Sequence, residues 1–181
     1  MKHLIQSSIL ALSLMCVAPA AMANPPSSKP SADVWTLSAD GTYGGTFLCA
    51  LGEMGMTLSL KLGGAVAYND YPGMHCKTGS GPCNDALNAR LKKMRKVDGV
   101  ITFFPTVGNP QAPKGAFRTS GVVEYRSKVS TRLLLDPGDW IRKPDNFGHS
   151  GLEAMIIEDR IIGKPTAPRC HAMDLHKTSD R

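Results

Sequence analysis

From Gly41 onward, the sequence is built of short apolar or β-branched runs separated by turn-forming residues. The clearest run, residues 56–62, has an apolar side chain at every second position, with Thr57, Ser59 and Lys61 in between. A period of two is typical of a strand that buries one face and exposes the other. Many short strands in succession favour an antiparallel β-sandwich or a flattened barrel. We therefore expect a mainly β protein with one of these two architectures.

Nine segments have the composition of strands in such a fold. The connections between them are rich in Pro and Gly, and Gly63-Gly64 and Glu158-Asp159 are predicted to form tight turns. The predicted strands are residues 43–51, 56–62, 65–68, 100–104, 115–125, 131–135, 152–157, 160–162 and 172–175.

Residues 84–96 interrupt this pattern and predict one short α-helix inserted between strands. Asn84 has the side chain of an N-cap, and Gly99 follows the expected end of the helix. The apolar residues near helical spacing are Ala86, Leu87, Leu91 and Met94.

The start of the chain has the form of a cleavable signal peptide. A positively charged start, a short apolar run and the small-residue site Ala21-Met22-Ala23 predict cleavage after residue 23. The apolar run is much shorter than the roughly 20 residues that cross a bilayer. Residues 24–33, rich in Pro and Ser, predict a flexible leader. Residues 34–181 are expected to form a single β-rich domain with no transmembrane segment, periplasmic or secreted.

Four cysteines remain after the predicted cleavage removes Cys16, and disulfides persist in an oxidising compartment. Four cysteines allow three pairings. We favour Cys76 with Cys83, which flank a turn-forming stretch, and Cys49 with Cys170, which would tie an early strand to the last one. Two such disulfides would crosslink the domain and stabilise it.

A cluster of five cations ends the predicted helix, in a chain whose formal net charge is +6. Such a cluster is a candidate contact for an acidic protein or an anionic envelope polymer. The alternative is a solvated helix face whose cations favour the negative end of the helix dipole. Nucleic acid is not expected, because no aromatic residues alternate with the cations. The five are Arg90, Lys92, Lys93, Arg95 and Lys96.

The segment 136–144 contains a second candidate contact. Trp140 lies there in a turn-rich stretch beside Arg142 and Lys143, and Trp and Arg are frequent in protein interfaces. In the alternative interpretation, Trp140 packs over one end of the sheet. The proline-rich loop 105–114 is a further candidate for a rigid contact.

Three catalytic or metal-binding patterns are incomplete in this sequence. Gly148-His149-Ser150-Gly151 resembles a serine nucleophile elbow, but Leu152 stands where that elbow requires glycine. The Met, His and Cys residues around positions 74–76 and 170–173 include soft-metal ligands, yet disulfide cysteines cannot ligate. No pair of carboxylates is singled out by spacing. The sequence therefore predicts no catalytic residue, no metal site and no cofactor.

Taken together, these features favour binding over catalysis. We expect an exported envelope protein that holds an acidic or anionic partner, in one form an inhibitor or immunity-type protein that blocks a wall- or membrane-damaging enzyme. Two alternatives stay open: a small exported cell-wall hydrolase that uses His149 and nearby carboxylates, and a periplasmic metal-handling protein that needs free thiols.

Overall fold

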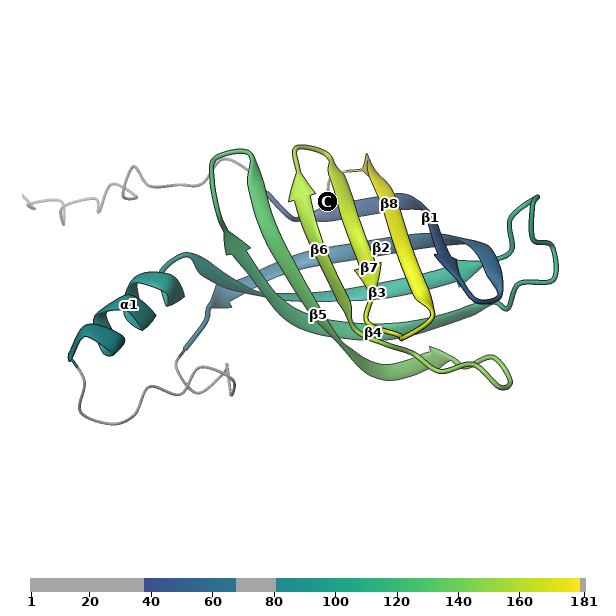
Figure 1. Ribbon diagram of the computed structural model, residues 1–181, viewed down its shortest axis with the longest axis horizontal. Coiled ribbons are helices and arrows are strands. Elements are labelled where there is room, and N and C mark those ends of the chain that lie inside the picture. Colours follow the sequence, from purple (N-terminus) through teal and green to yellow (C-terminus); the bar gives the residue numbers. More distant parts are fainter. Residues whose placement is uncertain (1–37, 68–80, 180–181) are drawn as a thin grey trace, which may run out of the picture. The chain divides into compact units, whose positions relative to one another are not determined.

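The computed structural model in Figure 1 describes residues 38–67 and 81–179. The chain divides into two units, Met1–Val34 and Trp35–Arg181, and all described residues belong to the second unit. The predicted signal peptide and leader lie outside the described residues.

Eight antiparallel strands form a closed barrel in which each strand pairs with its neighbour in sequence. The last strand pairs with the first and closes the barrel. The prediction of a mainly β, antiparallel fold with one short helix is therefore confirmed, in its barrel form. The strands are β1 (Gly41–Cys49), β2 (Gly52–Ala65), β3 (Met94–Phe104), β4 (Gly115–Tyr125), β5 (Ser130–Arg142), β6 (Leu152–Ile157), β7 (Arg160–Pro165) and β8 (Cys170–Ser179).

The core lies inside the barrel and follows from the alternation along each strand. On β2, Met56, Leu58 and Leu60 are buried, whereas Thr57 and Ser59 between them are partly exposed. Side chains from all eight strands fill the interior along most of its length, as expected for a barrel of this size. Fully buried examples are Tyr43, Met54, Phe103, Leu133, Ile156, Ile161 and Leu175.

Two predicted turns are strand in the structure. Gly63 and Gly64 lie within β2, because β3 begins early enough to pair with β2 as far as Ala65. The stretch 136–142 is the second half of β5, where register shifts against β4 accommodate Pro137. The tight turn at Glu158-Asp159 is confirmed, since Ile157 and Arg160 on either side of it pair directly.

The inserted helix α1 (Gly81–Leu91) begins and ends earlier than predicted. Asn84 is therefore inside the helix rather than its N-cap, and Gly99 lies within β3. Met94 is also a β3 residue, buried outside the barrel in a small cluster with Val122 and the last turn of α1. Within the described ranges, no helix has the length and apolar character needed to cross a membrane.

Candidate functional site

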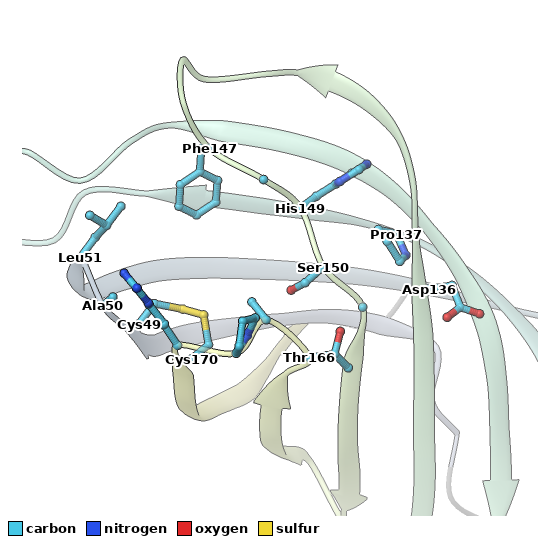
Figure 2. Close-up of a pocket in the computed structure, with 15 residues that line it drawn as sticks. Cys49, Ala50, Leu51, Asp136, Pro137, Phe147, His149, Ser150, Thr166 and Cys170 are labelled. Atoms are coloured by element: carbon cyan, nitrogen blue, oxygen red, sulfur yellow. A yellow bond between two sulfur atoms is a disulfide. The ribbon is translucent and has the colours of Figure 1, made fainter.

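One end of the barrel is hollowed by a cleft of about 640 Å³, which we call the mouth cleft. Its walls come from segments distant in sequence that meet where β1 and β7 end, beside the middle of β5, as the close-up in Figure 2 shows. Helix α1 lies at the opposite end of the barrel (Figure 1). The lining segments are residues 49–51, 136–137, 147–151 and 166–170.

The β5–β6 loop, residues 143–151, crosses the mouth without regular structure. Phe147 of this loop packs on Phe103 of the core, with ring centroids 4.7 Å apart. At the end of the loop, the carbonyl of Gly151 accepts a hydrogen bond of 2.8 Å from the backbone N–H of Thr166. Below the loop, a separate cavity of about 50 Å³ has apolar walls, and residues 147–151 line both spaces. The loop therefore forms a partition between the mouth cleft and the core.

Trp140 and His149 form an aromatic stack beside this partition. Their rings are 4.8 Å apart and inclined by only 15°. Phe117 meets His149 edge-on at 5.3 Å and Trp140 at 5.4 Å. Trp140 is half-buried and packs against the core, so its position matches the packing interpretation of the sequence. The stack holds the β5–β6 loop in place through ring contacts.

The predicted disulfide between Cys49 and Cys170 is present in the structure. It joins directly opposed residues of β1 and β8, the two strands that close the barrel, and lines the mouth cleft. As half-cystines, these residues have no thiolate with which to attack a substrate or bind a metal. The other predicted pair, Cys76–Cys83, lies outside the described residues, because Cys76 and the Cys83 side chain are not described.

The chemistry-bearing side chains of the cleft do not form a catalytic set in the described part of the chain. Among the described residues, the imidazole of His149 has ring contacts with Phe117 and Trp140 and no hydrogen bond to Ser150 or to a carboxylate. Three or more metal-ligating side chains gather nowhere within residues 38–67 and 81–179. The arrangement offers an apolar cleft with a few polar groups, which is the form of a binding site.

Two opposite charges line the mouth cleft. Asp136 lies at one end, away from Leu51 and the disulfide in Figure 2, and Arg169 precedes Cys170 in the chain. No ion pair joins the two side chains, nor does either pair with another described residue. Both charges therefore remain available to a ligand.

The structure divides the predicted basic cluster between several elements. Arg90 lies in the last turn of α1, Lys92 and Lys93 form an exposed turn, and Arg95 and Lys96 lie on β3 rather than on the helix as predicted. A helical period cannot distinguish a cation on a helix from one on the strand that follows it.

Arg90 forms a partly buried ion pair, in which the carboxylate partner is buried and the guanidinium is partly exposed. It donates two hydrogen bonds, of 2.8 and 3.0 Å, to the carboxylate of Glu124, and Arg126 donates a third of 2.9 Å. Burial alone would raise the pKa of Glu124, but the Arg90 hydrogen bond and the nearby arginine charges outweigh it and lower that pKa below its ordinary value. Arg90 therefore fixes the end of α1 to the barrel.

The predicted partner-binding residues do not form one surface. Trp140, Arg142 and Lys143 belong to the mouth end, where Arg142 and Lys143 are exposed but do not line the cleft. The basic cluster around Lys93 lies at the opposite end, where β3 begins. Sequence reasoning missed Phe147 and Arg169 in the cleft, although the position of Arg169 beside a disulfide cysteine offered a signal.

No protein-family model, curated protein or solved structure matches this chain.

Proposed function

We propose that this chain is an exported envelope binding protein that holds a small ligand in the mouth cleft. The observation that carries the proposal is the cleft itself, whose volume of about 640 Å³ lies within the range of small-molecule sites. The mouth of a small β-barrel is also a frequent place for such a site. Export is supported by the signal-like start of the chain and by a disulfide that suits an oxidising compartment.

The test places a large side chain at either of two exposed glycines, one in the loop at the mouth cleft and one in β2. A side chain added at Gly148 enters open space at the mouth cleft, and one added at Gly64 enters open space at the far end of β2. The probe is N-phenyl-1-naphthylamine, a neutral apolar dye that becomes fluorescent when it leaves water. We expect one dye per barrel in the wild type and in Gly64→Phe, and loss of binding in Gly148→Phe. Absence of saturable binding to the well-folded wild type would contradict the proposal.

A second candidate, an inhibitor of an envelope enzyme, is favoured by the β3–β4 loop. Val107 at its tip is fully exposed, at 103%. The loop is nevertheless fixed, because the Asn109 side chain donates a hydrogen bond of 2.6 Å to the carbonyl of Leu51. A rigid loop that presents an apolar side chain loses little conformational freedom on binding a partner.

This second function is tested by capture from an envelope extract with wild-type protein and with Val107→Asp. An enzyme retained and inhibited by the wild type, but not by the variant, would support it. Recovery of no enzyme by a folded wild-type protein would count against it.

A further inference from the structure

The chemistry of the mouth cleft defines the class of ligand, an inference that rests on the proposed function. We infer that the cleft takes a compact anionic amphiphile, with an apolar ring system in the cleft and a carboxylate or sulfonate at Arg169. Three features support this assignment: the apolar walls, the charge at one end and the shallow depth.

Apolar groups dominate the walls of the cleft. The phenyl ring of Phe147 and the Cys49–Cys170 disulfide face the same space as Leu51 in Figure 2. Pro137 and Pro168 add two rigid apolar surfaces. A flat apolar body gains free energy by leaving water for such walls, because burial of apolar area drives binding.

Arg169 provides the anion contact. Its side chain is exposed and forms no ion pair with an acidic residue of the described chain, so its guanidinium is free to bind two oxygens of an anionic group at once. Asp136 repels an anion from its own end of the cleft, which leaves the Arg169 end as the place for the acidic group. The net positive charge of the chain also favours anionic ligands.

The depth of the site limits the ligand to a compact molecule. Beneath residues 147–151, the space beside Phe103 and Phe117 is about 50 Å³. That volume holds little more than a single water-sized group. Further down, Leu58 and Leu133 are fully buried and fill the barrel. In the described barrel, a long acyl chain would have to displace buried core side chains to go deeper, whereas a fused ring system can stay in the cleft above the loop.

The experiment compares two dyes with the same ring system, one of them anionic. 1-Anilinonaphthalene-8-sulfonate differs from N-phenyl-1-naphthylamine by one sulfonate group. In Arg169→Gln, we expect the dissociation constant for the sulfonate to rise about tenfold and that for the neutral dye to stay within about twofold. The matched control is Lys128→Gln, which removes one exposed positive charge from the β4–β5 turn at the other end of the barrel.

Each outcome separates the ligand class from the proposed function. Binding of neither dye to the folded wild type overturns the proposed function itself. Binding of both dyes with no selective loss of the sulfonate in Arg169→Gln overturns only the anionic assignment. Equal losses in Arg169→Gln and Lys128→Gln also overturn it, since the effect would then follow net charge. The unfolding midpoint of each variant is measured as well, to check that the variant is folded and that the sulfonate dye is not binding to exposed apolar surface of unfolded protein.

Discussion

At the scale of single residues, Glu124 is the one buried charged side chain in the described part of the chain. Its carboxylate lies outside the barrel wall, where Arg90 and Arg126 approach it from α1 and from the β4–β5 turn. Both arginines are partly exposed, so solvent weakens their attraction to the carboxylate. We therefore expect Glu124→Gln to lower the free energy of unfolding at pH 7 by about 1–2 kcal/mol, less than the loss of a fully buried pair.

The effect of Glu124→Gln is expected to depend on pH. The pKa of Glu124 is lower in the folded protein than its ordinary value of 4.5, so the ionised carboxylate stabilises the fold above that pH. This stabilisation is lost as the pH falls through the lower, folded-state pKa. Urea unfolding of wild type and variant should therefore converge in acid. Glu153→Gln, which breaks the exposed pair with Arg132, is the control and should change stability by no more than about 0.5 kcal/mol. A pH-independent difference between wild type and Glu124→Gln would contradict the assignment.

At the scale of elements, β4 contributes to both apolar clusters of the described domain, because adjacent residues of the strand point to opposite sides of the barrel wall. Val123 points into the barrel and is fully buried, whereas Val122 faces outward against Met94 and the last turn of α1. We expect Val123→Ala to lower the free energy of unfolding by about 2 kcal/mol, since it leaves a cavity in the main core.

Val122→Ala is expected to act locally. Its outward cluster is small, so the expected loss is about 1 kcal/mol, with faster amide hydrogen exchange confined to α1 and the adjoining end of β3. Hydrogen exchange and urea unfolding of both variants check this difference. Equal exchange profiles for the two variants would show that the outer cluster is not a separate unit.

The strands were predictable from the sequence where alternation is clear and turns flank them. The predicted ranges of β4 and β6, 115–125 and 152–157, agree with the structure. The end of α1 was not predictable, because Met94 continues the apolar spacing of the helix although it belongs to the strand that contacts that helix. Local periodicity does not distinguish a residue on a helix from one that packs against it. The predicted turn at Gly63-Gly64 was wrong for a related reason, since pairing of β2 with β3 overrides the local turn preference of the two glycines.

At the scale of the whole molecule, the mouth cleft could not be predicted from the sequence. Its walls combine residues near positions 50, 136, 149 and 168, which only the closure of the barrel brings together. The sequence did suggest one of these long-range contacts, the pair Cys49–Cys170, which is favoured among three possible pairings because it would tie an early strand to the last one. The remaining contacts depend on how the strands are ordered around the closed barrel, which the alternation within one strand does not specify.

The same disulfide leads to a prediction about the stability of the whole barrel. Cys49 and Cys170 are 121 residues apart in sequence, so the crosslink restricts most of the unfolded domain. In the loop-entropy model, a crosslink of this span contributes about 4–5 kcal/mol. We expect the double variant Cys49→Ser/Cys170→Ser to keep the barrel, since backbone hydrogen bonds still join β1 to β8, and to lose about 3–5 kcal/mol of stability.

Urea unfolding of the oxidised wild type and the double variant measures this loss. The variant should unfold at lower urea, with a slightly steeper dependence on denaturant because its unfolded chain is more expanded. Reductant should shift the wild type towards the variant and leave the variant unchanged, apart from any effect of other cysteines. An unchanged free energy of unfolding would mean that the backbone hydrogen bonds between β1 and β8 keep the barrel closed without the disulfide. The crosslink would then matter mainly as an apolar wall of the mouth cleft, and its loss would appear in dye binding rather than in stability.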